Sequence, residues 1–133
     1  MTDKRVSAII FNDKKILLIH RIKNGSEYFV LPGGSVEKEE DNMDALMREV
    51  KEETNLDIQV GKELWQIKSN ADVRTQHIFL ASKFMGALML GSPEKERQSD
   101  NNKYILEWHD IVDLKNITFY PCEIVKNLIM EFV

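Results

Sequence analysis

Cysteine, proline and long apolar runs are all scarce in this sequence of 133 residues. Its single cysteine, Cys122, cannot form a disulfide within the chain, and no segment approaches the roughly 18 apolar residues of a membrane-spanning helix. The first ten residues, MTDKRVSAII, also lack the apolar stretch of a signal peptide. We therefore expect neither a disulfide scaffold nor a membrane protein, and we predict a protein of the reducing cytoplasm.

Positive charge is not in excess either, because 22 acidic and 18 basic residues give a formal net charge of -4. This balance argues against broad electrostatic attraction to a nucleic acid polymer or an anionic membrane. A small anionic substrate remains compatible with it, because a bound cation can invert the local charge. No repeat or proline-rich linker divides the chain, so we expect one domain over residues 1–133, and the hydrophobic content of 43% fits a globular core.

Apolar, β-branched runs separated by turn residues predict several β-strands. The expected strands cover residues 6–11, 16–22, 28–31, 58–67, 75–84 and 104–108. Regular structure should stop at Pro32-Gly33-Gly34, because proline removes a backbone donor and glycine permits positive φ. The polar and charged segment 91–103 is interpreted as a mobile loop.

Helical spacing of apolar residues follows in two places. In the segment 41–54 one face carries Met43, Leu46, Met47 and Val50. Asp41 is the expected N-cap of this helix, and Asp44 should support its first turn. A final helix can start at Pro121, with Ile124, Leu128 and Phe132 on a common stripe. The pattern predicts an α/β fold with a mixed β-sheet between helices, and it does not give the strand order.

The segment between Glu37 and Glu53 is unusually acidic. Its eight acidic residues are Glu37, Glu39, Glu40, Asp41, Asp44, Glu49, Glu52 and Glu53. On a helix, Glu49, Glu52 and Glu53 occupy a sector roughly 100° wide beside the apolar face. The mutual repulsion of these carboxylates must be balanced by a positive charge, which Arg48 or a hard cation such as Mg²⁺ can provide. The cluster alone also fits an ordinary solvated helix face.

The spacing of these residues distinguishes the two interpretations. Gly34, five residues, Glu40, seven residues and then R-E-V-K-E-E-T-N-L over residues 48–56 resemble the Nudix box, G-x5-E-x7-R-E-U-x-E-E-x-G-U, where U is a bulky aliphatic residue. Eight of its nine specified positions match, over 23 residues from 34 to 56. The preceding L-P-G-G and the Val36-Glu37 pair also resemble the family's usual entry to the box. The strand pattern around the box agrees with the Nudix fold along most of the chain, which implies an α/β/α sandwich.

Two positions depart from the family pattern. Asn55 stands where the pattern has glycine, at the expected end of the helix. Asparagine tolerates the left-handed conformation of such a position better than other non-glycine residues. Glu39 stands where glycine is common before the box glutamate, which changes the loop but removes no ligand.

The resemblance implies a role for each residue of the box. Glu49, Glu52 and Glu53, with the Gly33 carbonyl, would hold Mg²⁺, which Mn²⁺ can replace. Either Glu49 or a carboxylate from a later loop would deprotonate or orient the attacking water. Arg48 would orient Glu49 or its neighbours, and Glu40 would fix that arrangement.

Outside the box, the resemblance implies an additional carboxylate in the loop before the last strand. The candidates there are Glu94, Glu96 and Asp100, although a residue of this type in such a segment is more often an ordinary loop charge. Arg21, at a strand end, is a candidate contact to a substrate phosphate. Tyr28 and Phe29 border a base or belong to the core. We interpret the remaining aromatic and thiol side chains as packing or structural residues, namely His20, His77, His109, Trp65, Trp108 and Cys122.

The function implied is Mg²⁺-dependent hydrolysis of a nucleoside diphosphate linked to another group. Nucleoside triphosphates are the first candidate substrates, because a short chain carries little beyond the catalytic fold. Dinucleoside polyphosphates and sugar nucleotides such as ADP-ribose are the next candidates. A non-catalytic nucleotide-sensing module is the alternative of another class, although such relatives usually lose box carboxylates that this chain retains. The partner is thus a small nucleotide-like molecule, and homodimer formation is left open.

Overall fold

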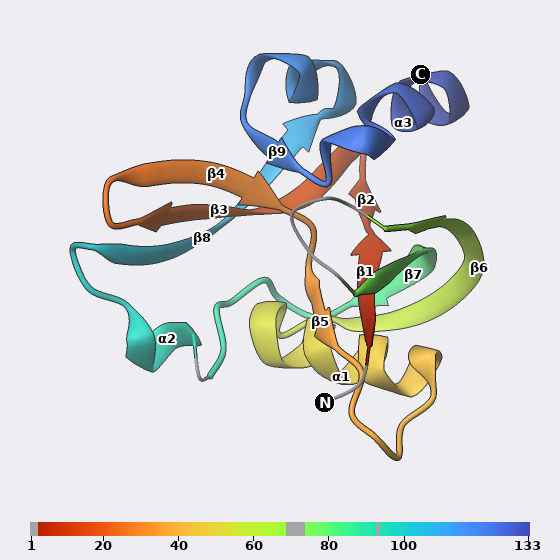
Figure 1. Cartoon of the computed structure of the whole chain (residues 1–133), viewed down its shortest axis with the longest axis horizontal. Helices are drawn as coiled ribbons and strands as arrows, with labels where there is room; N and C mark the ends of the chain where they lie inside the picture. The colour runs from red at the N-terminus through yellow and green to blue at the C-terminus, as the bar shows by residue number, and fades with distance from the viewer. Residues whose placement is uncertain (1–2, 69–73, 93) are drawn as a thin grey trace.

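The first two apolar runs of the chain form strands of two different β-sheets. The computed structural model describes residues 3–68, 74–92 and 94–133 (Figure 1). In the first sheet the order is β5-β1-β7-β6, with β1 and β7 parallel and the other neighbours antiparallel. These strands are β1 (Lys4–Ile9), β5 (Gly33–Ser35), β6 (Asp57–Ile67) and β7 (Thr75–Met85).

The second sheet is built around β3 (Lys15–Lys23), which pairs with three other strands. The order is β2-β3-β4-β9, and β8 also pairs with β3 in antiparallel fashion. Its other strands are β2 (Phe11–Asn12), β4 (Ser26–Val30), β8 (Asn102–Asp110) and β9 (Phe119–Tyr120). The α/β class is confirmed, with two mixed sheets where one was expected. The predicted strand 6–11 was wrong at its end, because β1 stops at Ile9 and Phe11 already pairs with Ile16 in the second sheet.

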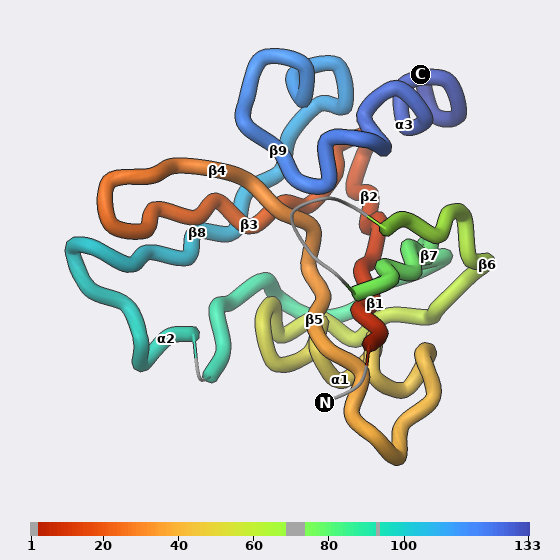
Figure 2. The backbone as a smooth tube through the Cα atoms, in the orientation of Figure 1, coloured from red at the N-terminus to blue at the C-terminus, as the bar shows by residue number. Residues whose placement is uncertain are grey.

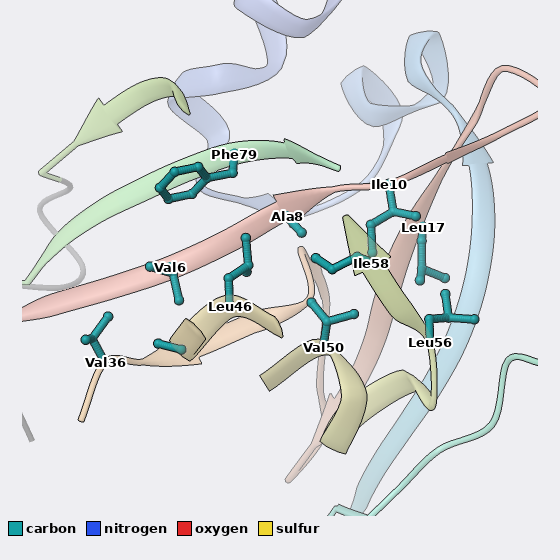
Figure 3. Close-up of a cluster of buried hydrophobic side chains, with 11 residues drawn as sticks. Val6, Ala8, Ile10, Leu17, Val36, Leu46, Val50, Leu56, Ile58 and Phe79 are labelled. Carbon is teal, nitrogen blue, oxygen red and sulfur yellow. The ribbon is translucent and has the colours of Figure 1, made fainter. Parts of the chain in front are cut away.

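Helix α1 (Asn42–Thr54) covers one face of the first sheet through a buried apolar cluster (Figure 3). Leu46 and Val50 point from α1 toward Val6 and Ala8 of β1, and all four side chains are fully buried. The expected apolar face of this helix was partly wrong. Met43 and Met47 are exposed, and the positions that face the sheet are Ala45, Leu46, Val50, Glu53 and Thr54. The face that packs is therefore rotated toward the acidic sector.

Both ends of α1 follow the sequence-based expectation. The Asp41 side chain accepts a hydrogen bond from the Asp44 backbone N–H at 2.8 Å, as an N-cap does. Asn55 ends the helix with φ 67° and ψ 6°, in the left-handed region. The Asn55 backbone N–H donates to the Lys51 carbonyl, as a left-handed helix cap requires.

The C-terminal third differs most from the expectation. The segment 91–103 is not an irregular loop throughout, because it contains α2 (Glu94–Arg97) and the start of β8. Beyond β8 lie the 3-10 helices η1 (Ile111–Asn116) and η2 (Cys122–Ile124), and α3 (Val125–Phe132) follows. The final α-helix thus starts at Val125, after a 3-10 turn that follows Pro121. Cys122 is exposed on this turn, so its interpretation as a packing residue was wrong.

A second apolar cluster joins β3 and β4 to η1 and α3. Its buried members include Ile16 and Leu18 of β3, Phe29 of β4 and Leu128 of α3. Ile124 is buried in the same cluster and Phe132 packs against it, as the predicted stripe requires. No helix among the described residues is long and apolar enough to cross a membrane.

Candidate functional site

The two glycines of β5 bring the backbone into direct contact with α1 and β1. A Cβ atom on Gly34 would lie 2.4–2.6 Å from the carboxyl atoms of Glu49. A Cβ atom on Gly33 would lie 2.0 Å from the Val6 carbonyl oxygen. The Gly33 backbone N–H donates a 2.8 Å hydrogen bond to the Glu53 carboxylate. The L-P-G-G sequence therefore allows a backbone approach that any side chain would block.

Arg48 connects four of the carboxylate and carbonyl groups around the box. Its Nε and Nη2 donate to the two oxygens of Glu40 at 2.7 and 2.9 Å, in a bidentate pair. Its Nη1 donates to Glu49 at 3.0 Å and reaches Glu52 at 3.4 Å, and Nη2 also donates to the Ser35 carbonyl. The hydrogen bonds from Arg48 lower the pKa of Glu40 to about 2. Glu40 thus stays ionised and holds the guanidinium beside Glu49 and Glu52.

Glu53 and Glu49 are carboxyl groups in an unfavourable electrostatic position. Glu53 is buried, and this desolvation raises its pKa well above the usual value, while the Gly33 N–H opposes the rise. Burial also raises the pKa of Glu49, against the lowering effect of Arg48. Glu94 adds to the rise at both groups through its negative charge. A cation at this position would relieve the repulsion.

Glu94 reaches this position because the loop after β7 packs on the C-terminal end of α1 (Figure 2). The Met89 N–H donates to the Thr54 carbonyl at 2.9 Å. A Cβ atom on Gly91 would lie 1.9 Å from the Glu52 carbonyl oxygen, so only glycine allows the loop to lie so close. One Glu94 oxygen is buried and has no hydrogen-bond partner within the described part of the chain.

The structure separates the three loop candidates. The charge of Glu94 acts on Glu49 and Glu53, and the charge of Glu52 acts on Glu49. We call these four residues the carboxylate cluster. Glu96 is exposed and accepts a hydrogen bond from Ser92 Oγ, and Asp100 is exposed. Neither of these two is among the charges that act on Glu49 or Glu53.

The carboxylate cluster fits a hard divalent cation by its chemistry. All the atoms that the cluster offers to a metal are carboxylate oxygens, which Mg²⁺ prefers, and the cluster contains no soft ligand. The buried oxygen of Glu94 has no hydrogen-bond partner in the described ranges of the chain and is therefore free to bind a cation. In the arrangement seen here, no group of three or more His, Cys, Asp or Glu side chains among the described residues is placed to hold a metal ion. Hydrogen bonds to Gly33 and Arg48 occupy oxygens of Glu53, Glu49 and Glu52, so binding of a cation would exchange some of these bonds.

Beside the carboxylate cluster lies a cavity of about 670 Å³, which we call the inter-sheet cavity. Glu53 is part of its lining, which joins it to the cluster. Strands of both sheets border it, with Arg5, Ser7 and Gln76 from the first sheet and Ile19, Arg21, Tyr28, Val30 and Tyr104 from the second. The segment 120–123 supplies the remaining border.

Arg21 and Tyr28 both line the inter-sheet cavity, as expected for substrate contacts. The Arg21 guanidinium already contacts other groups of the protein, however. Its Nη1 donates to Asn102 Oδ1 and to the Lys103 carbonyl at 2.9 and 2.8 Å, and the group stacks over the Tyr104 ring at 3.7 Å. A contact from Arg21 to phosphate stays a prediction. Phe29 belongs to the core and stacks on His20 at 4.2 Å, so it does not border the cavity.

Several cavity residues were not found by sequence reasoning. Arg5 is the basic residue whose charge acts on Glu53, and Gln76 is its register partner across the parallel β1–β7 pair. Tyr104 was predicted only as the start of a strand, and Tyr120 was given no role. These residues come together through strand pairing between distant segments, and no local spacing pattern shows such pairing.

The remaining histidines and tryptophans are structural, as expected. His20 and His109 contact the two oxygens of Glu107 at 2.9 and 2.7 Å, and His77 lies 3.3 Å from Glu63. Trp108 packs on the first apolar cluster and on Phe84, and Trp65 packs on the second cluster.

Comparison with known proteins identifies the family of this chain. A family model described as the NUDIX domain matches residues 1–127. An ADP-ribose pyrophosphatase of Methanocaldococcus jannaschii is 34% identical over 128 residues, which are 92% of this chain and 70% of that protein. The uncharacterized Nudix hydrolase YvcI of Bacillus subtilis is 27% identical over 86% of this chain and 70% of its own length.

The structure of a MutT Nudix hydrolase from Burkholderia pseudomallei superposes with a TM-score of 0.73 and 25% identity. The match covers 93% of this chain and 95% of that one. Fold, box geometry and family match thus lead to one assignment. The chain belongs to the Nudix family and is a hydrolase.

Proposed function

We propose that this protein is a Mg²⁺-dependent hydrolase of nucleoside diphosphates linked to another group, with nucleoside triphosphates as its leading substrates. The observation that supports this most directly is the carboxylate cluster at the edge of the inter-sheet cavity. Glu53 belongs to both. A substrate whose diphosphate lies at the cluster would extend its nucleoside into the cavity. Mn²⁺ is proposed as a substitute for Mg²⁺.

In this proposal Glu49, Glu52 and Glu53, with the Gly33 carbonyl, hold the cation, and Glu94 is the additional loop carboxylate. When bound, the cation neutralises the diphosphate and assists the attack of water on phosphorus. Arg48 keeps Glu49 and Glu52 oriented through its bonds to both, and Glu40 keeps Arg48 in place.

The reaction is a substitution at phosphorus. Water forms the new P–O bond, the anhydride P–O bond breaks, and the departing phosphate takes the bonding electron pair. Glu49 or Glu94 accepts the proton that the water releases. No covalent intermediate with the protein is required.

The test is a substrate panel with product identification. Purified protein, freed of bound metal, is assayed with Mg²⁺, with Mn²⁺ and with excess chelator, on nucleoside triphosphates, dinucleoside polyphosphates and ADP-ribose. From nucleoside triphosphates we expect release of phosphate or pyrophosphate with either metal and none with chelator. Full turnover in chelator would contradict the mechanism. Nucleotide binding without release of any product would favour a nucleotide-sensing module.

Glu94→Gln tests the loop carboxylate. We expect a loss of activity of about 10- to 100-fold, because an amide keeps the shape but removes the charge beside Glu49 and Glu53. Glu96→Gln, in the same short helix, is the matched control and should stay near wild type. Equal activities of the two variants would remove Glu94 from the site.

ADP-ribose is the second candidate substrate. The specific observation in its favour is the relative from Methanocaldococcus jannaschii, which is named an ADP-ribose pyrophosphatase. Formation of AMP and ribose 5-phosphate from ADP-ribose would support this candidate. We further propose that the protein works in the cytoplasm as a single domain, and its oligomeric state can be measured by light scattering during the same purification.

A further inference from the structure

The two walls of the inter-sheet cavity have different chemistry. On the second sheet, Tyr28, Arg21 and Tyr104 form one row across β4, β3 and β8, because Arg21 pairs in register with both tyrosines. Arg21 holds the Tyr104 ring by stacking on it at 3.7 Å. Tyr120 meets Tyr28 edge to face, with ring centroids 5.9 Å apart. This wall is an aromatic surface with fixed side chains.

The opposite wall is polar and lies on the first sheet. Arg5 and Gln76 are register partners on β1 and β7, and Ser7 is the next inward residue on β1. The Gln76 side chain is only 8% exposed, and among the described residues no group forms a hydrogen bond with its amide. The amide atoms stay accessible from the cavity, so a ligand bound there can supply their hydrogen-bond partners.

We propose that this cavity receives the aromatic base of the substrate and that Gln76 is the residue that selects among bases. The inference rests on the proposed nucleotide hydrolysis and adds the part of the substrate that the protein distinguishes. An amide offers one donor and one acceptor, which match neighbouring acceptor and donor atoms on the edge of a base. The tyrosines supply the surface on which a flat base stacks. A ligand without a base would leave the Gln76 amide unpaired and the tyrosine surface uncovered.

The chemistry of the walls also sets the direction of the substrate. Glu53 marks the end of the cavity next to the carboxylate cluster. Because Arg5 acts electrostatically on Glu53, we assign Arg5 to the phosphates, and its register partner Gln76 and the tyrosines to the base. A site that is built to hydrogen-bond one base discriminates strongly against a ligand that lacks the matching group.

Binding of nucleoside monophosphates tests the inference without turnover, because these ligands contain no phosphoanhydride. We would titrate the protein in Mg²⁺ with AMP, GMP, CMP, UMP and ribose 5-phosphate, and measure Kd by calorimetry. Wild type should bind at least one nucleotide about 10-fold more tightly than ribose 5-phosphate, and it should rank the bases. Gln76→Met keeps the volume and should reduce the spread of Kd values among the bases by about 5- to 100-fold. Gln76→Glu replaces the donor by an acceptor and should change the rank order.

Gln59→Met, on an exposed position of β6, is the matched control and should keep the wild-type ranking. Tyr120→Leu should weaken all four nucleotides together and leave ribose 5-phosphate unchanged, and it provides a second measurement if a Gln76 variant fails to fold. The inference is overturned if no nucleotide binds more tightly than ribose 5-phosphate, or if folded Gln76→Met keeps the wild-type spread of Kd values and folded Gln76→Glu keeps the wild-type order. Failure of the proposed function shows separately, as absent Mg²⁺-dependent turnover by a wild type that still ranks the bases.

Discussion

Glu53 lies in a buried, negatively charged environment, where ionisation of a carboxyl group is unfavourable and a bound cation would make it favourable. It is buried, its pKa is raised by that burial, and the negative charges of Glu49 and Glu94 act on it. Within residues 3–68, 74–92 and 94–133, the hydrogen bond that it accepts comes from the Gly33 N–H at 2.8 Å. A group held in this way contributes little to the stability of the metal-free fold, which supports our proposal that Glu53 binds a cation.

Glu53→Gln should fold normally and lose most activity. The glutamine oxygen can still accept the Gly33 hydrogen bond, but the charge that attracts a cation is gone. We expect kcat to fall by at least about 100-fold, with an unfolding midpoint in chelator that is equal to or above that of wild type. Glu49→Gln should be impaired to a similar degree, and exposed Glu39→Gln should change the rate little. Near-wild-type kcat for both impaired variants with saturating substrate would show that the site is assigned to the wrong residues.

Gly33 and Gly34 should respond differently to substitution by alanine. The Cβ of Gly34→Ala meets the carboxyl end of Glu49, which can rotate away, so activity should fall while the unfolding midpoint changes little. The Cβ of Gly33→Ala meets the backbone of β1, which cannot rotate away, so stability should fall by about 1–3 kcal/mol or more. Chemical denaturation and Mg²⁺-dependent turnover of the two variants give both comparisons. If both variants lose stability to the same extent, the Glu49 side chain is not free to move.

At the scale of elements, the end of α1 and the loop after β7 form one unit. Asn55 ends the helix in the left-handed region, and its side chain donates a 2.9 Å hydrogen bond to the Ala87 carbonyl of the loop. The same loop passes over Glu52 and Glu53 through Gly91 and continues into α2, where Glu94 lies. Asn55 therefore serves the helix cap and the loop that carries the fourth carboxylate.

Asn55→Gly should be close to neutral for stability. Glycine relieves the left-handed strain, but it removes the bond to Ala87 and increases the entropy of the unfolded chain. Asn55→Val should cost about 1 kcal/mol or more, because a β-branched residue resists positive φ. Val should also weaken Mg²⁺ activation, since the carboxylates lie within one turn of this cap. Unfolding midpoints and Mg²⁺ titrations would refute this account if Val matched wild type in both while Gly was clearly destabilised.

At the scale of the whole molecule, local sequence patterns predicted the box helix, its two caps and most strands, because each depends on neighbouring residues. The spacing of Arg48, Glu49, Glu52 and Glu53 also predicted which side chains would gather. Sequence could not show that Gln76 and Tyr104 line one cavity, since that depends on how two sheets pack. The exposure of Met43 and Met47 was missed for the same reason, because helical periodicity gives a face but not its partner.

Two ion-pair networks outside the apolar clusters should determine how the free energy of unfolding falls at acid pH. Arg48 lowers the pKa of Glu40 to about 2, and at Glu107 burial opposes hydrogen bonds from His20 and His109 that together lower its pKa. A carboxyl group whose pKa is lower in the folded state stabilises the fold above its unfolded value near 4.5 and loses that effect as pH falls toward its folded pKa. The free energy of unfolding should therefore decline below about pH 4.5, and less steeply for Glu107→Gln and Glu40→Gln than for wild type. Glu39→Gln is the exposed control. Urea titrations from pH 3 to 7 measure the slopes, and identical slopes for all four proteins would show that neither network contributes.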